Sequence, residues 1–276
     1  MTETDISFFK MSGSGNDFII VDNRDRVVRE ENLGPWVASV CRRKHSVGAD
    51  GLILIERADE ADFKWRYFNA DGGEVEMCGN GGRCAARFAL LKGIAGPRLR
   101  FETMAGVIQA EVTGERVKLE MPEPSAAQLD YPLEVEGETF TVSSITVGVP
   151  HVVTWVENLE TAPVVRLGRA IRCHEKYLPA GTNANFVQSL DDGTLAIRTY
   201  ERGVEDETLA CGTGSAASAL IAASKGMVTS PGDLHTRGGE LLRIYFEKKG
   251  HGFGHVFLEG DAKVIYEGRL WKEAVS

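Results

Sequence analysis

Short runs of apolar and β-branched residues, bounded by Gly, Asp or Pro, recur along the chain and predict strands. In the first half these runs lie at residues 18–22, 52–56, 63–68, 98–102, 107–112 and 116–121. In the second half they lie at residues 151–156, 185–190, 194–200, 241–247 and 255–259. The pattern therefore predicts a sheet-rich chain whose two halves follow a similar order.

Two segments have the opposite pattern and predict buried helices. Residues 81–92 and 214–225 are apolar or small on nearly every face, which is typical of a helix enclosed by other elements. Each segment ends in Lys and is followed by Gly93 or Gly226, as expected where a left-handed residue comes after a helix. Weaker helical patterns at 33–43 and 166–178 predict outer helices. Each half is therefore expected to be a curved sheet around one central helix.

The two buried helices follow similar cysteine motifs, and this similarity indicates an internal duplication. Cys78 lies in MCGNGGRC and Cys211 lies in ACGTGSAA, 133 positions further on. Sliding the sequence by 133 positions keeps an ungapped register between residues 48–93 and 181–226, with identical pairs that include Tyr67/Tyr200. A register held over so long a segment predicts two homologous α+β domains.

The length supports the same division, because 276 residues exceed the range in which one hydrophobic core keeps growing. We place the first domain at residues 1–121 and the second at 133–276. The Pro-rich segment 122–132 between them is the best candidate for a linker. We leave open a return of the extreme C-terminus to the first domain.

Composition excludes several classes of function. The net charge of −9 argues against a nucleic-acid-binding protein, which would show a basic field. No run approaches the roughly 18 apolar residues of a membrane span, and MTETDISFFK is not a secretory signal. With an odd count of five cysteines, we expect unbridged thiols in a cytoplasmic protein without membrane or nucleic-acid partners.

The paired CGxG motifs carry the candidate chemistry. Each places a sulfur at the start of a helix, where unpaired N–H groups and the helix dipole favour a thiolate and lower the thiol pKa. Without side chains at Gly79, Gly81, Gly212 and Gly214, a carboxylate can approach the bare N–H groups.

Two homologous domains that face each other would bring Cys78 and Cys211 to opposite sides of one cleft. A thiolate on one face of an α-carbon could remove its proton while a thiol on the other face delivers one. The helix N–H groups would stabilise the charge that develops on the substrate carboxylate. This arrangement suits the inversion of a stereocentre.

The sequence also bears on other roles for the cysteines. Cys41, Cys84 and Cys173 fit structural thiols. The absence of CxxC and HxxxH pairs disfavours zinc, so no metal is expected. Two alternatives stay open: a thiol–disulfide pair, and a redox-switched protein that binds an amino acid without converting it.

The longer motifs are similar to those of a known family. FKMSGSGNDFIIVDN, FNADGGEVEMCGNGGRC, GTNANFVQ and YERGVEDETLACGTGSAAS together resemble diaminopimelate epimerases, in the same order along the whole chain. The resemblance implies two similar domains, each a barrel-like mixed sheet around a central helix, with the active site between them. It also implies a cytoplasmic homodimer that interconverts LL- and meso-diaminopimelate for lysine and peptidoglycan synthesis, without pyridoxal phosphate or metal.

The resemblance further implies a set of site residues. Cys78 and Cys211 match the two bases, one a thiolate and the other a thiol. The residues that match donors to the reacting carboxylate are Gly79, Asn80, Gly212 and Thr213. The residues that match contacts to the distal amino-acid group are Asn16, Asn69, Asn183, Glu201 and Arg202.

Two positions depart from the family pattern. Val149 stands in Gly148-Val149-Pro150-His151 where the family often reads Gly-Asn-Pro-His, and Gly51 stands where many members carry Gln. His151 is a further candidate site residue, with a structural role as the alternative. A proline racemase or hydroxyproline epimerase is disfavoured because Asn80 follows Gly79, and a phenazine-type isomerase lacks the paired thiols. A racemase of another amino acid stays open.

Overall fold

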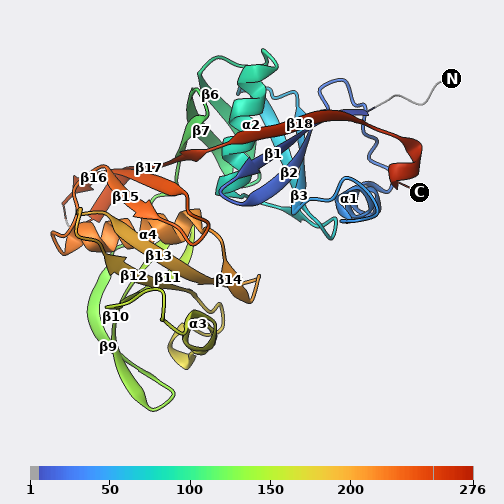
Figure 1. Ribbon diagram of the computed structural model, residues 1–276. Helices are drawn as coiled ribbons and strands as arrows, with labels where there is room; N and C mark the ends of the chain where they lie inside the picture. The colour runs from blue at the N-terminus through green and yellow to red at the C-terminus, as the bar shows by residue number, and fades with distance from the viewer. Residues whose placement is uncertain (1–5, 251, 276) are drawn as a thin grey trace. The chain divides into compact units, whose positions relative to one another are not determined.

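The chain folds into two compact units, seen in a computed structural model that describes residues 6–250 and 252–275 (Figure 1). The first unit runs to Leu119 and resumes at Gly260, and the second unit is Glu120–Glu259. The C-terminal residues therefore complete the first unit. Residues 122–132, where the sequence analysis places a linker, belong to the second unit, and a strand begins at Gln128.

The first unit is a mixed sheet with two α-helices. Its strands are β1 (Ile6–Gly13), β2 (Asn16–Asp22), β3 (Gly51–Glu56), β4 (Phe63–Asn69), β5 (Glu74–Val75), β6 (Arg98–Thr103), β7 (Gly106–Thr113), β8 (Arg116–Glu120) and β18 (Lys263–Leu270). Its helices are α1 (Leu33–Cys41), α2 (Gly79–Leu91) and the 3₁₀ turn Lys272–Val275. Strands β18, β1 and β2 pair antiparallel, and β3 joins β2 in parallel. Strand β4 is antiparallel to β3 and parallel to β6, from which β7 and β8 continue antiparallel.

Helix α2 is the centre of the first unit. Its Cys84, Ala86 and Phe88 are fully or almost fully buried in a cluster with Phe18 and Trp65 of the sheet. Helix α1 packs on the other face of the same strands in a separate cluster. Because alternate residues of a strand point to opposite faces, β2 and β3 are buried on both sides and have near-continuous apolar sequences.

The second unit repeats this order. Its strands are β9 (Gln128–Val135), β10 (Glu138–Val147), β11 (Val149–Trp155), β12 (Asn183–Ser189), β13 (Leu195–Glu201), β14 (Asp206–Thr208), β15 (Gly232–His235), β16 (Leu241–Lys249) and β17 (Gly252–Asp261). Its helices are α3 (Val164–Arg172), α4 (Gly212–Ser224) and the 3₁₀ turn Glu175–Tyr177. Strands β11 and β12 are parallel, as are β13 and β15, and the remaining neighbours pair antiparallel.

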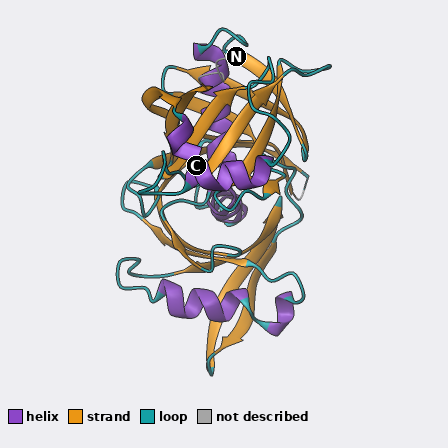
Figure 2. Cartoon of the chain, turned by 90° about the vertical axis from the view of Figure 1, so that its right-hand side faces the viewer, coloured by secondary structure: helices purple, strands orange, loops and turns teal. Residues whose placement is uncertain are grey.

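Helix α4 has the same place in the second unit as α2 has in the first. Figure 2 shows it nearly end-on, with strands curving around it. Residues 216–217 and 219–223 of α4 lie in one apolar cluster with side chains of β10, β12, β13 and β16. Helix α3 covers the outer face of the sheet in another cluster. The predicted curved sheet around one central helix is therefore confirmed in both units.

The predicted helices are all present, with small differences in their bounds. Helices α2 and α4 each begin two residues earlier than predicted, at Gly79 and Gly212. Gly93 and Gly226 have φ of +66° and +73°, which confirms the predicted left-handed ends. Among the described residues, no helix has the length and apolar character needed to cross a bilayer.

The ungapped register between the halves is wrong in β3 and β4, which correspond to β12 and β13. Tyr67 and Tyr200, an identical pair in that register, lie on opposite sheet faces: Tyr67 packs around α2 and Tyr200 packs beneath α3. The strand neighbours Ile53 and Tyr67 face the central helix, as Asn185 and Thr199 do in the second unit. Strands β12 and β13 therefore follow β3 and β4 by 132 positions, while the CGxG motifs are offset by 133. A shift of one residue exchanges the two faces of a strand.

Candidate active site

The two CGxG cysteines occupy matching positions at the starts of the central helices. Cys78 precedes α2 with φ −144° and ψ 116°, and Cys211 precedes α4 with φ −120° and ψ 110°. The carbonyl of Cys78 accepts from Gly82 N–H at 2.8 Å, and that of Cys211 accepts from Ser215 N–H at 2.9 Å. Both residues are therefore N-caps, which confirms the predicted placement of each sulfur at a helix start.

The glycines at the two helix starts differ in the space around them. A Cβ at Gly79 would meet no atom within 4 Å, so this helix start is open to an approaching group. A Cβ at Gly81 would lie 3.2 Å from Ile53 Cδ1. A Cβ at Gly214 would lie 2.3 Å from Asn185 Oδ1 and 3.3 Å from Cys211 Sγ. Glycine at positions 81 and 214 therefore also allows each helix to pack closely against its sheet.

Two predicted asparagines of the first unit form one directed chain of hydrogen bonds. Arg83 Nη2 donates to Asn80 Oδ1 at 2.9 Å, and Asn80 Nδ2 donates to Asn16 Oδ1 at 2.6 Å. Asn16 Nδ2 then donates to the Asp50 carboxylate at 3.1 Å. This series of hydrogen bonds runs from the buried Arg83 guanidinium to the Asp50 carboxylate, so each bond polarises the next. It fixes the orientation of both asparagine amides and uses one N–H of each.

Asp50, the anion at the end of this series of hydrogen bonds, belongs to an ion-pair network. Arg43 Nη2 contacts Asp17 at 2.5 Å and Asp50 at 2.8 Å, and buried Lys10 contacts Asp17 at 2.7 Å. Burial alone would raise the pKa of Asp17, but the hydrogen bonds from Arg43 and Lys10 hold it at about 2. The network keeps the start of β2 in place beside the start of β3.

Asn69 is linked to Cys78 through a tyrosine that the sequence analysis did not select. The Tyr67 hydroxyl donates to Asn69 Oδ1 at 3.0 Å and also hydrogen-bonds the Cys78 sulfur. Tyr67 is 6% exposed, and burial raises its pKa. The hydroxyl is therefore a permanent proton donor beside the sulfur.

His151 is fully enclosed in the second unit. Asn185 Nδ2 lies 3.3 Å from His151 Nδ1 and donates to the Val152 carbonyl at 2.9 Å. Because the amide donates to Nδ1, the imidazole proton is assigned to Nε2, and this atom has no hydrogen-bond partner among the described residues. Burial lowers the pKa of His151 to about 3, with a further contribution from Arg202.

The remaining predicted contacts of the second unit gather at the ends of β12 and β13. Asn183 Oδ1 accepts from Arg202 N–H at 2.8 Å, and its Nδ2 donates to the Pro150 carbonyl at 3.1 Å. Arg202 Nη1 donates to the Ala180 carbonyl at 2.8 Å. Glu201 lies next to Arg202, and burial raises its pKa. The structure therefore brings Asn183, Glu201 and Arg202 together.

The sulfur of Cys211 has polar neighbours of its own. Thr213 Oγ1 lies 3.5 Å from Cys211 Sγ, which brings these two predicted residues into contact. Asn185 Oδ1 faces the same helix start and accepts from Thr199 Oγ1 at 3.0 Å. Both Asn185 and Thr199 are buried.

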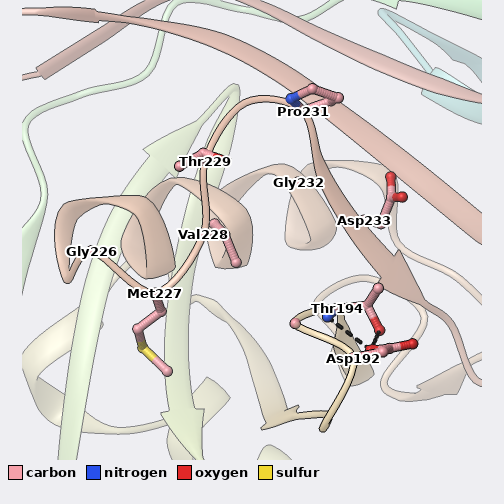
Figure 3. A pocket seen from close by; sticks show the side chains of 10 residues that line it. Asp192, Thr194, Gly226, Met227, Val228, Thr229, Pro231, Gly232 and Asp233 are labelled. Atoms are coloured by element: carbon pink, nitrogen blue, oxygen red, sulfur yellow. Dashed lines mark hydrogen bonds between the residues drawn. The ribbon is translucent and has the colours of Figure 1, made fainter.

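A surface hollow in the second unit lies at the end of α4 that is far from Cys211 (Figure 3). It is lined by residues 192–194, 226–229 and 231–233, around the C-terminal end of α4. Cys211 is at the other end of this 13-residue helix, about 20 Å away at 1.5 Å per residue. The Asp192 carboxylate is held by Thr194 and that of Asp233 by Arg243. Within the described part of the chain, no group of three or more His, Cys, Asp or Glu is placed to hold a metal.

Sequence reasoning missed several polar residues that contact the predicted site residues or the helix starts. These are Tyr67, Asp50 and Arg83 in the first unit and Asn185 and Thr199 in the second. Arg83 and Asn185 lie inside the recognised motifs GNGGRC and GTNANF, so their motif positions were an available signal. Tyr67 and Thr199 carry no such signal, because only strand pairing shows which face they occupy.

Solved structures of similar architecture define the class of fold. A Bacillus anthracis phenazine biosynthesis protein of the PhzF family matches with a TM-score of 0.76 at 17% identity, over 97% of this chain and 99% of that chain. A hydroxyproline epimerase from Agrobacterium vitis matches with a TM-score of 0.67 at 14% identity, over 97% of this chain and 93% of that chain. The chain therefore has the two-repeat mixed-sheet fold common to these proteins.

Sequence relatives identify the family within that class. The family model described as diaminopimelate epimerase matches residues 8–126 and 143–265, one match in each half. The diaminopimelate epimerase of Aquifex aeolicus is 48% identical over 281 residues, covering 98% of this chain and 99% of the relative. That of Archaeoglobus fulgidus is 41% identical over 278 residues, covering 96% of each. The chain belongs to the diaminopimelate epimerase family, and the expected pair of homologous repeats is confirmed.

Proposed function

We propose that this chain interconverts LL- and meso-diaminopimelate by proton transfer between two cysteines, without pyridoxal phosphate or a metal ion. One observation carries the proposal beyond family membership: Cys78 and Cys211 are N-caps of the two central helices, in matching backbone geometry. One sulfur acts as thiolate and removes the α-proton. The other acts as thiol and delivers a proton to the opposite face of the same carbon.

The helix starts supply the electrostatic part of the reaction. The N–H groups of Gly79 and Asn80, and those of Gly212 and Thr213, are the first in their helices and have no carbonyl one turn earlier to accept from them. They bind the carboxylate attached to the reacting carbon. As the proton leaves, negative charge spreads onto that carboxylate, and the N–H groups and helix dipoles stabilise it.

The far end of diaminopimelate is itself an amino acid, so its binding site needs a cation for the carboxylate and oxygen acceptors for the ammonium group. The Arg202 guanidinium binds its carboxylate, and the oxygens of Glu201 and the asparagines Asn16, Asn69 and Asn183 accept from its ammonium group. The Nε2–H of His151 is one further donor without a partner among the described residues. A substrate with an amino-acid group at each end satisfies all of these side chains.

The test is hydrogen exchange at the α-carbon. In D₂O the enzyme should place deuterium at the α-carbon of the product, with no pyridoxal absorption band. Cys78→Ala and Cys211→Ala should each lower turnover by at least about 100-fold, because each removes one of the two acid–base groups. Cys173→Ser removes an exposed thiol as the matched control and should retain activity. A fully active Cys78→Ala or Cys211→Ala enzyme would rule out the two-base mechanism.

Two other outcomes of the same assay identify the alternatives. Tight binding of diaminopimelate without any α-hydrogen exchange would favour a binding protein. Exchange with another amino acid, found by screening a small panel, would favour a different racemase. Val149 keeps this alternative open, because it stands where the family often has Asn.

We also propose that the enzyme works in the cytoplasm as a homodimer, so sedimentation should give twice the 30.1 kDa chain mass.

A further inference from the structure

The Tyr67 hydroxyl lies between a predicted base and a predicted substrate contact. It donates to Asn69 Oδ1 at 3.0 Å and hydrogen-bonds the Cys78 sulfur. Cys78 also packs against the apolar cluster that contains Tyr67. A tyrosine hydroxyl has one proton and can donate to one acceptor at a time. Two acceptors therefore compete for this proton.

The ring of Tyr67 is held so that its hydroxyl stays at this point. It packs edge-on against Phe18, with ring centroids 5.8 Å apart, and is stacked on Trp65 at 5.7 Å. Gly51 leaves the space for the ring, since a Cβ there would lie 2.5 Å from Tyr67 Cε2 and 3.0 Å from its hydroxyl oxygen. The absence of a side chain at Gly51 is therefore linked to the position of Tyr67.

We propose that Tyr67 is a positioning residue for the acid–base step, whose single hydroxyl proton moves its hydrogen bond between Asn69 and Cys78 as the sulfur changes protonation state. When Cys78 is a thiol, the hydroxyl donates to Asn69. When Cys78 is a thiolate, the hydroxyl turns to the sulfur, because the charged acceptor makes the stronger hydrogen bond. No covalent bond forms or breaks at Tyr67, and the proton stays on its oxygen.

The surrounding charges favour this role. Besides Cys78, the nearby ionisable groups Asp50 and Cys41 act on the hydroxyl. Burial raises the pKa of the Cys41 thiol to about 12, so it stays neutral. Asp50 is paired with Arg43 at 2.8 Å. In the first turn of α2, Arg83 donates to Ser14 and Asn80. The charge that changes beside the hydroxyl during the reaction is thus that of Cys78.

The hydrogen bond has two consequences. It stabilises the thiolate form of Cys78, so this cysteine ionises at lower pH than it would beside a phenylalanine ring. It also releases Asn69 Oδ1 when the thiolate forms, so that this oxygen becomes available to the substrate ammonium group. Formation of the base and completion of the distal binding site are thereby coupled. The inference rests on the proposed function for the role of Cys78, but its test does not.

The test follows the ionisation of Cys78 by its rate of alkylation. Iodoacetamide labelling of Cys78 is measured against pH by peptide mass spectrometry in the Cys211→Ala background, because two interacting thiols would titrate as a pair. Tyr67→Phe keeps the ring contacts and removes the hydroxyl. A hydrogen bond to a charged group corresponds to a shift of about one to two pKa units, so the inflection should rise by that amount.

Tyr200→Phe is the matched control. It also removes a buried tyrosine hydroxyl, which donates to Glu205 at 3.3 Å on the other sheet face of the second unit, and the Cys78 inflection should not move. Tyr67→3-fluorotyrosine keeps the shape and strengthens the donor, so it should lower the inflection even if Tyr67→Phe fails to fold. An inflection unchanged in both Tyr67 variants would overturn the proposal.

Activity separates this inference from the proposed function. In the otherwise unaltered enzyme, Tyr67→Phe should lower kcat and move the acid limb of the kcat profile upward by the same amount as the alkylation inflection. If the two-base mechanism is wrong, Cys78→Ala will retain full epimerisation turnover. That result would leave the alkylation measurement interpretable.

Discussion

At the scale of single residues, burial decides which chemical form a side chain takes. His151 is 1% exposed, and its Nδ1 faces the side-chain NH₂ of Asn185. Burial lowers its pKa to about 3, against 6.5 for a free histidine. The imidazole is therefore neutral in the folded protein at every pH where the enzyme would work, and it offers an N–H rather than a charge.

The lowered pKa of His151 predicts how stability changes with pH. Between pH 6.5 and 5 the unfolded chain protonates this histidine and the folded chain does not, so the free energy of unfolding should fall as the pH falls. The contribution is at most about 1.4 kcal/mol per pH unit. Urea unfolding at several pH values should show a flatter dependence for His151→Gln.

The half-buried His174 is the control for this experiment. Its ring hydrogen-bonds Glu134 O and Lys176 N, so His174→Gln measures the effect of losing a hydrogen-bonded histidine from the same unit. An equal slope in the His151→Gln variant would contradict the role assigned to burial.

At the scale of elements, glycine has different purposes at the first and third positions of the central helices. Gly79 has open space where a Cβ would be, while Gly214 lies against Asn185 and the Cys211 sulfur. Neither has a positive φ, so conformational freedom is not the reason for glycine at these positions. The first leaves room for a ligand, and the second allows the helix to approach the sheet.

This difference predicts opposite effects for two alanine substitutions. Gly214→Ala should lower the free energy of unfolding by about 1–3 kcal/mol, because the new methyl group forces Asn185 out of its buried hydrogen bonds. Gly79→Ala should leave stability within about 1 kcal/mol of the original while raising KM, because it narrows the carboxylate site. Thermal or urea unfolding together with steady-state kinetics would measure both. Equal losses of stability would contradict the assignment.

Several strands could not be predicted because their sequences carry features that argue against a strand. Strand β1 contains Lys10 at a buried position, and only the tertiary structure supplies its partner Asp17. Strand β9 contains Pro132, which is tolerated because β9 pairs with β10 on one side at the edge of the sheet. Residues 128–132 of the predicted linker are thus part of an edge strand, while Pro122 and Pro124 precede it.

At the scale of the whole molecule, duplication explains why one chain carries two equivalent thiols. The order of parallel and antiparallel pairings is the same in both units, from β2–β3 and β4–β6 to β11–β12 and β13–β15. The segments that join β3 and β4 to the neighbouring α-helices differ in length by one residue from those that join β12 and β13 to theirs. The side chains of these strands are therefore shifted by one position between the repeats, while the cysteine motifs are not. The proposed mechanism needs only that the helix starts stay equivalent.

The proposed mechanism makes one prediction about the entire chain. If Cys78 and Cys211 flank one carbon atom, mild oxidation should join them in a disulfide and abolish activity until a reductant is added. Peptide mass spectrometry without reduction would detect the cross-linked pair. Cys41 and Cys84 are buried and should remain unmodified. Two unlinked thiols at Cys78 and Cys211 after complete oxidative inactivation would contradict their opposition.

The sequence by itself determined the central helices, the placement of each cysteine at a helix start, the repeat and the family. These features depend on local periodicity and on motifs of a few consecutive residues. Only the tertiary structure decided what surrounds each sulfur, since Tyr67 and Asn185 are brought there by pairing between strands and a shift of one residue would turn either away. It also decided that β18 completes the first unit by pairing with β1. Such long-range pairings depend on the free energy of the whole fold, which no short segment of sequence contains.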